Sequence, residues 1–167
     1  MPDPHDTLSI FAEVAVALAG FSGIIIAFGR RSSGALTPLE LRRLSNLFVL
    51  SGLVLISSLL GISLLHIESL EPTTLWIGGS ALVFLLVTPW LILDSRKVAR
   101  LEKKERAEVK AYVIYPFNFL AVVLLLLQIA NVFVLNKSWP FFLALVLAIT
   151  FAFQQFILLV RMGFRDA

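Results

Sequence analysis

The sequence predicts an all-α membrane protein, a polytopic bundle of five transmembrane helices with the N-terminus outside and the C-terminus in the cytoplasm. Of its 167 residues, 59% are hydrophobic and only 15% are charged, which is too apolar for a soluble globular domain. Apolar runs of about 20 residues recur, and each is long enough to cross the roughly 30 Å hydrocarbon core of a bilayer. The basic residues also gather on one side of the membrane, as the positive-inside rule requires.

The five apolar runs define the expected helices. They cover about residues 8–29, 44–65, 75–93, 116–135 and 139–160. The connections between them are short, the longest being a basic segment over residues 94–111, so almost nothing remains for a soluble domain. We therefore expect residues 1–167 to form a single membrane domain.

The basic residues set the predicted orientation. Thirteen of the 14 fall in the first loop, the third loop or the C-terminal tail, and Lys137 alone falls elsewhere. Five crossings place those three segments on one side, which the positive-inside rule makes cytoplasmic. The net charge of +3 thus follows the topology and indicates no nucleic acid partner. The thirteen are Arg30, Arg31, Arg42, Arg43, Arg96, Lys97, Arg100, Lys103, Lys104, Arg106, Lys110, Arg161 and Arg165.

The first helix is expected to be retained in the mature protein. Its flank carries Asp3 and Asp6 and no basic residue, the wrong charge for the start of a cleaved signal peptide. Thr7 or Ser9 can cap its start, and Gly29 ends the apolar run ahead of two arginines. The second helix fills the apolar run between Arg43 and His66.

Prolines and charge pairs shape the later helices. Pro89 lies within the third helix and predicts a kink there. The segment 94–111 has good helix formers and oppositely charged residues four apart, so it should extend the third helix into the cytoplasm. Pro116 and Pro140 are expected in the first turns of the fourth and fifth helices, where a missing backbone donor costs nothing.

Small residues recur at intervals of four along the first helix. Ala15, Ala19, Gly23 and Ala27 form this small-residue row, and in lipid such rows allow close approach of helix backbones. We expect another helix to pack on the row. An intramolecular partner is favoured, and the first helix of a neighbouring copy is the alternative.

One carboxylate interrupts the apolar runs. Glu13 lies roughly 8 Å below the outer start of the first helix, where an ionisable group is costly and often functional. Gln128, Asn131, Ser58 and Ser80 fall at comparable depths. These five residues could line a polar pathway in the outer leaflet. The alternative is that Glu13 hydrogen-bonds an amide to lock the bundle, or extends to the membrane surface.

The sequence indicates no enzyme, cofactor or metal site. The chain contains no cysteine, which excludes disulfides, thiolate catalysis and cysteine metal sites. His66 stands near Glu68 and Glu71, but an interfacial histidine in a polar loop explains this spacing better than a metal ligand. No metalloprotease, nucleotide-binding or hydrolase motif occurs.

Two function classes remain. The leading hypothesis is a small oligomeric channel or permease-like protein that moves protons, ions or small solutes along the polar pathway. The alternative is a non-catalytic membrane scaffold or accessory subunit that binds a partner through its first helix and its basic cytoplasmic loop. Both imply contact with membrane lipid and with a homo-oligomer or a partner membrane protein. We expect an integral protein of a bacterial inner membrane.

Overall fold

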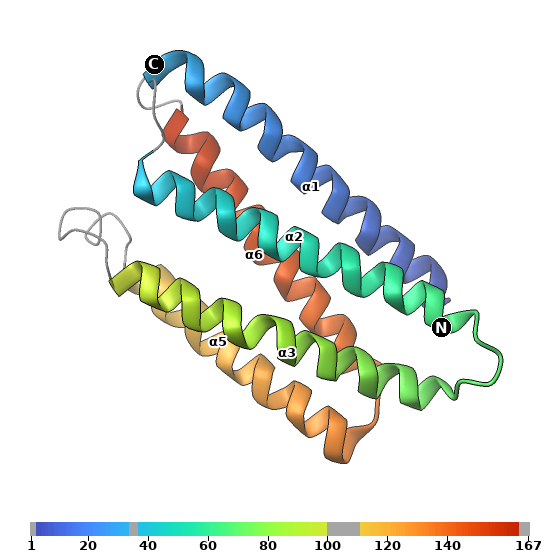
Figure 1. Ribbon diagram of the computed structural model, residues 1–167. Coiled ribbons are helices and arrows are strands. Elements are labelled where there is room, and N and C mark those ends of the chain that lie inside the picture. Colours follow the sequence, from blue (N-terminus) through green and yellow to red (C-terminus); the bar gives the residue numbers. More distant parts are fainter. Residues whose placement is uncertain (1–2, 34–36, 100–110, 164–167) are drawn as a thin grey trace. The chain divides into compact units, whose positions relative to one another are not determined.

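The computed structural model describes residues 3–33, 37–99 and 111–163, and every regular element in these ranges is a helix (Figure 1). Side chains are described for residues 3–24, 37–96 and 117–161. The predicted all-α class is therefore confirmed. The elements are α1 (Pro4–Ser33), α2 (Pro38–Leu65), α3 (Pro72–Ala99), α5 (Ala111–Ala130), the π-helix η1 (Asn131–Leu135) that continues α5, and α6 (Trp139–Gly163).

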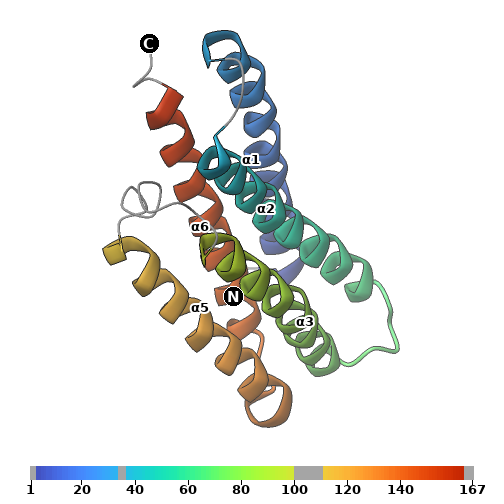
Figure 2. The same ribbon diagram turned by 60° about the vertical axis from the view of Figure 1, so that its left-hand side comes forward.

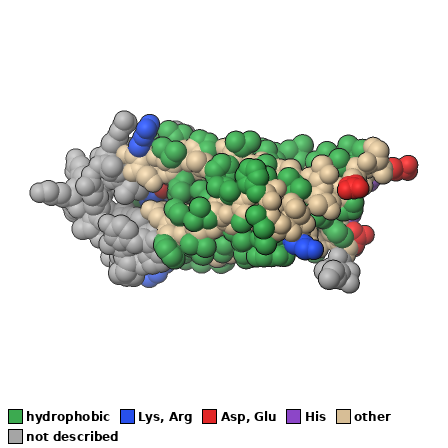
Figure 3. Space-filling model, turned by 90° about the horizontal axis from the view of Figure 1, so that it is seen from below, with side chains coloured by type: hydrophobic (Ala, Val, Ile, Leu, Met, Phe, Trp, Pro, Cys, Tyr) green, Lys and Arg blue, Asp and Glu red, His purple; other side chains and the backbone are tan. Residues whose placement is uncertain are grey.

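Among the described residues, five helices are long and apolar enough to cross a membrane, in agreement with the predicted number of spans. Hydrophobic side chains cover most of the visible surface, and the charged side chains lie toward the helix ends (Figure 3). The orientation of the chain in the membrane stays a prediction. The candidate spans cover Pro4–Ile24, Pro38–Leu65, Pro72–Arg96, Phe117–Leu135 and Trp139–Arg161.

Several helices begin before the predicted starts of their apolar runs. α1 begins at Pro4, so Thr7 and Ser9 lie inside it and neither caps its start. α2 begins at Pro38 rather than at residue 44. Thr37 caps it by accepting a hydrogen bond from the Glu40 backbone N–H (3.2 Å), while Glu40 Oε2 accepts one from the Thr37 N–H (2.8 Å). This reciprocal capping box satisfies two N–H groups that would otherwise lack partners. α5 begins at Ala111, so Pro116 is not in its first turn.

The third helix is longer than its apolar run. α3 continues through Pro89 to Ala99, so it extends into the basic segment as predicted. The rest of that segment, residues 100–110, lies outside the described residues.

The chain divides into two compact units. Unit 1 comprises Met1–Ser69 and Leu145–Ala167, and unit 2 comprises Leu70–Ala144. α6 begins in unit 2 and continues into unit 1. The expectation of a single membrane domain stays a prediction.

Unit 1 is built on the antiparallel pair α1 and α2, which run side by side (Figures 1 and 2). Leu8 packs against Gly61, where an added β-carbon would lie 2.8 Å from Leu8 Cδ1. Because both helices rise about 1.5 Å per residue, this contact sets Ala15 near the level of Val54. Both residues are fully buried. A small residue on one helix thus stands at the level of a large one on the other.

Unit 2 contains α3, α5, η1 and the first residues of α6. α3 packs beside α5 and η1. Gly79 of α3 faces the buried ring of Phe141, and an added β-carbon at Gly79 would lie 2.9 Å from Cδ2 and Cε2 of that ring. Trp76, one turn earlier, lies 6.1 Å from Phe141 and 5.4 Å from Phe142 between ring centroids. Aromatic contacts therefore join α3 to the start of α6.

Candidate functional site

The five residues of the predicted polar pathway fall in both units. Ser80, Gln128 and Asn131 belong to unit 2, and Glu13 and Ser58 belong to unit 1. Within unit 2 the structure brings Ser80 and Asn131 into direct contact.

Asn131 is the centre of a buried hydrogen-bond network. Its side chain is fully buried. Its Nδ2 donates to Ser80 Oγ at 2.7 Å and to the Lys137 carbonyl at 2.9 Å, and its Oδ1 accepts from the Lys137 N–H at 2.9 Å. Both donors and the acceptor oxygen of the amide are thus engaged, which satisfies a polar group that would be costly to bury alone.

The backbone around Asn131 changes form to make these contacts. A π-helix spans Asn131–Leu135, and Asn136 follows in the left-handed region at φ 51°. The Asn136 N–H donates to the Asn131 carbonyl at 3.1 Å. Asparagine tolerates this conformation better than other non-glycine residues. The wider turn reverses the chain, so that Lys137 meets the Asn131 amide just before α6 begins.

Gln128 lies one turn before Asn131 and also hydrogen-bonds to the segment that follows the chain reversal. Its Nε2 donates to the Pro140 carbonyl at 3.0 Å. Its Oε1 is buried and has no hydrogen-bond partner among the described residues. Gln128 and Asn131 are both fully buried, and the side-chain amide of each hydrogen-bonds to the segment that joins η1 to α6.

Ser58 lies in the buried part of α2. Its side chain is fully buried, and its hydroxyl has no hydrogen-bond partner among the described residues. Ser51 and Ser57 share both properties. The register set by Leu8 and Gly61 places Ser58 near the level of Phe11 in α1.

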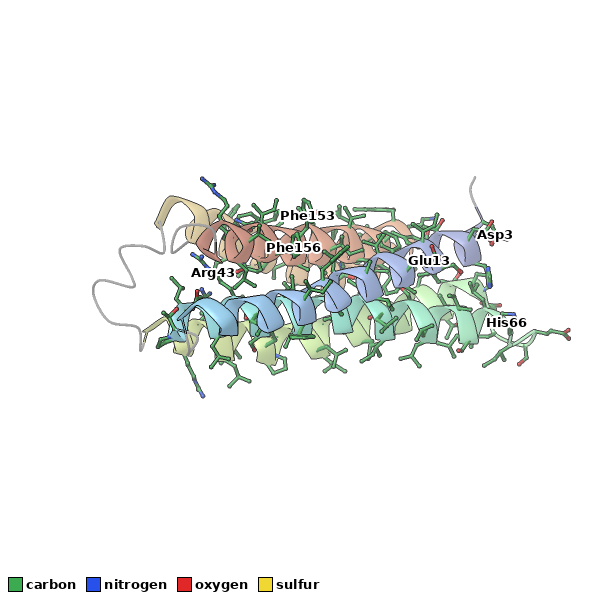
Figure 4. The ribbon with its side chains drawn as sticks, turned by 90° about the horizontal axis from the view of Figure 1, so that it is seen from above. Asp3, Glu13, Arg43, His66, Phe153 and Phe156 are labelled. Carbon is green, nitrogen blue, oxygen red and sulfur yellow. The ribbon has the colours of Figure 1, made fainter. Side chains whose placement is uncertain are left out.

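Glu13 is exposed. It lies on α1, inward of the end at which Asp3 lies (Figure 4). Ala17, Gly20 and Ile24 follow it at intervals of four, three and four residues, and all three are also exposed. At 100° per residue these positions fall within about 60° of one another. We call Glu13, Ala17, Gly20 and Ile24 the outer face of α1.

The opposite side of α1 is the packed one. Its buried positions also step by three or four residues, and they are Leu8, Ala12, Ala15, Leu18 and Ser22. The predicted small-residue row does not follow this side. Ala15 is fully buried, Ala19 is half-buried and Gly23 is exposed. A strict interval of four turns by about 40° per step and so leaves the packing face. The side chain of Ala27 lies outside the described residues.

Ala17 and Gly20 were missed as candidates by the sequence reading. The signal was present, because their spacing from Glu13 alternates between four and three residues and therefore stays on one helix face. Residues at a strict interval of four instead form a row that winds around the helix. The alternating spacing identifies two faces instead, one packed and one open.

Comparison with protein-family models, with curated protein sequences and with solved structures finds no match. The class of the protein therefore follows from its own fold. It is a five-helix multi-pass membrane protein.

Proposed function

We propose that the protein is a non-catalytic membrane scaffold that associates with a second copy of itself through the outer face of α1. The observation that carries this proposal is the exposure of Glu13 within a candidate span, on a face that also carries the small residues Ala17 and Gly20. A carboxyl group that faces hydrocarbon is costly. A second helix on this face would supply it with a hydrogen-bond partner.

Gly20 supports close approach of another helix. A β-carbon added at Gly20 would meet no atom within 4 Å, so packing within the chain does not require glycine there. Glycine inside a helix costs about 1 kcal/mol relative to alanine. Small residues on a membrane helix offset that cost when they let two backbones come close. Ala17, one turn earlier on the same face, has the small side chain that such a contact needs.

Symmetry and chemistry favour a second copy as the occupant. Copies of one chain insert with the same orientation, so a two-fold axis along the membrane normal sets each residue of α1 at the level of its counterpart. Glu13 then meets Glu13 of the second copy. Two neighbouring carboxyl groups can hydrogen-bond to each other. A polar pair of this kind stabilises helix association in lipid.

The test is self-association in lipid vesicles, measured by energy transfer between donor-labelled and acceptor-labelled copies. Gly20→Leu should weaken association at least tenfold, because the longer side chain holds the two helices apart. Gly78→Leu is the matched control, since Gly78 is also exposed and a β-carbon there also meets nothing within 4 Å. Wild-type protein that stays monomeric, or that associates only with another membrane protein, would overturn the self-association proposal.

A conduit is the second candidate function, and the buried polar atoms without a partner favour it. Among the described residues of unit 1, the hydroxyls of Ser51, Ser57 and Ser58 are of this kind, and such atoms can bind water or a passing ion. The experiment is proton and cation flux into vesicles with wild-type protein and with Glu13→Gln. Glutamine keeps the hydrogen bonding that supports association but cannot carry a proton. Flux that disappears in Glu13→Gln while association persists would support the conduit, and no flux in either protein would support the scaffold.

A further inference from the structure

The two histidines of the chain, 61 residues apart in sequence, meet at one end of unit 1. Because α1 and α2 are antiparallel, the start of α1 lies beside the end of α2. The ring centroids of His5 and His66 are 5.9 Å apart, with 73° between the ring planes. Both residues are exposed. Figure 4 shows His66 at the end of the structure where Asp3 also lies.

Hydrogen bonds leave the same nitrogen free on each ring. His66 Nδ1 lies 2.8 Å from the Ile62 carbonyl oxygen, and since a carbonyl only accepts, Nδ1 must carry the proton. His5 Nδ1 lies 3.5 Å from Asp6 Oδ1, a carboxylate that likewise favours the proton on Nδ1. Neither Nε2 has a hydrogen-bond partner among the described residues. The lone pair of Nε2 is therefore available on both rings.

This arrangement is typical of histidines that bind a metal ion. A ligating histidine usually donates its other ring N–H to a carboxylate or a backbone carbonyl, which fixes the tautomer and the ring orientation. His5 has the carboxylate of Asp6 in this position, and His66 has the carbonyl of Ile62.

The spacing of the rings also fits one shared ion. With a metal–nitrogen distance of about 2.0 to 2.1 Å, each ring centroid lies about 3.2 Å from the metal. Two rings on one ion then have centroids roughly 5 to 6 Å apart, depending on the angle between them. We propose that His5 and His66 clamp a divalent transition-metal ion through their Nε2 atoms and so join the start of α1 to the end of α2.

The donor set selects the class of ion. Imidazole nitrogen suits Zn²⁺, Ni²⁺ and Cu²⁺, whereas Mg²⁺ and Ca²⁺ prefer oxygen ligands. The described residues hold no group of three or more histidines, cysteines or acidic residues that could bind a metal. Water therefore completes the coordination shell, and the site should bind Zn²⁺ reversibly. The sequence reading considered His66 with Glu68 and Glu71 and predicted no metal site, because it could not foresee that His5 lies beside His66.

The chain is well suited to the test, because it has two histidines and no cysteine. The full-length protein, purified with a tag that contains no histidine, is titrated with Zn²⁺ by calorimetry. His5→Ala, His66→Ala and the double variant are compared with wild type. We expect one Zn²⁺ per chain, and each single substitution should reduce the affinity at least tenfold, to the level of the double variant. Asp6→Asn keeps both ligands and should weaken binding less than either histidine substitution does.

Three results would overturn the clamp. They are no Zn²⁺ binding by folded wild-type protein, unchanged binding in the double variant, and a single variant that binds like wild type. Circular dichroism confirms that each variant is folded. Because both histidines are exposed, neither alanine substitution removes a core side chain.

Discussion

The side-chain amide of Asn131 donates a 2.7 Å hydrogen bond to the hydroxyl of Ser80, 51 residues earlier in the chain. The same amide nitrogen donates to the Lys137 carbonyl, and the amide oxygen accepts from the Lys137 N–H. One buried side chain, at the first residue of η1, thus connects α3 to the turn before α6. This network stabilises the arrangement of helices within unit 2.

Asn131→Leu should destabilise the protein by about 2–3 kcal/mol, because it removes three hydrogen bonds and leaves the Ser80 hydroxyl buried without its partner. Reversible unfolding of the detergent-solubilised protein measures the change. Ser80→Ala loses only one of the three bonds and should cost about 0.5–1 kcal/mol. Equal effects of the two substitutions would contradict a network centred on Asn131.

Gly79→Ala should also destabilise unit 2. The added β-carbon would lie 2.9 Å from the Phe141 ring, and that ring is buried and cannot move aside without a cost of about 1–3 kcal/mol. Gly78→Ala is the adjacent control, since a β-carbon there meets nothing within 4 Å. It should be neutral or slightly stabilising, because alanine favours the helix. A shift in unfolding midpoint that is the same for both variants would show that Phe141 does not pack against Gly79.

The sequence predicted the five spans because each is a long apolar run, and lipid leaves a hydrophobic segment few alternatives. It placed the start of α2 too late because the first turns of that helix carry Glu40, Arg42 and Arg43. It placed the start of α5 too late because Pro116 was expected in the first turn, whereas the helix already begins at Ala111. The capping box of Thr37 and Glu40 has a sequence pattern, a threonine followed three residues later by a glutamate. The contact between Asn131 and the Lys137 backbone has no such pattern, because it depends on the π-helix and on the left-handed conformation of Asn136.

The candidate site was less predictable than the fold. Depth along a helix follows from residue number, so the sequence could place Gln128 and Asn131 at similar depths. The packed side of α1 depends on the rotation of the helix about its axis. The row of small residues at intervals of four does not stay on that side, because Gly23 is exposed. The proximity of His5 and His66 follows only from the antiparallel register of α1 and α2. Contacts between distant segments therefore required the structure.

The predicted orientation can be tested with single cysteines in the cysteine-free chain. Ser69→Cys and Lys137→Cys should react with a membrane-impermeant maleimide added outside intact cells, because both positions are exposed and lie on the side opposite the basic loops. Ser33→Cys and Lys104→Cys should react only after the membrane is permeabilised. Labelling of Ser33→Cys and Ser69→Cys from the same side would contradict five crossings with the N-terminus outside.

Disulfide crosslinking of Ala17→Cys tests the proposed scaffold most directly. The chain has no native cysteine, so any crosslinked dimer must form between the introduced residues. Gly52→Cys is the control, because the register of Leu8 and Gly61 sets Gly52 near the level of Ala17 on the neighbouring helix α2. Mild oxidation in native membranes should give a dimer with Ala17→Cys and not with Gly52→Cys, and Gly20→Leu should suppress it. Equal crosslinking at both positions, or none at Ala17→Cys, would contradict association through the outer face of α1.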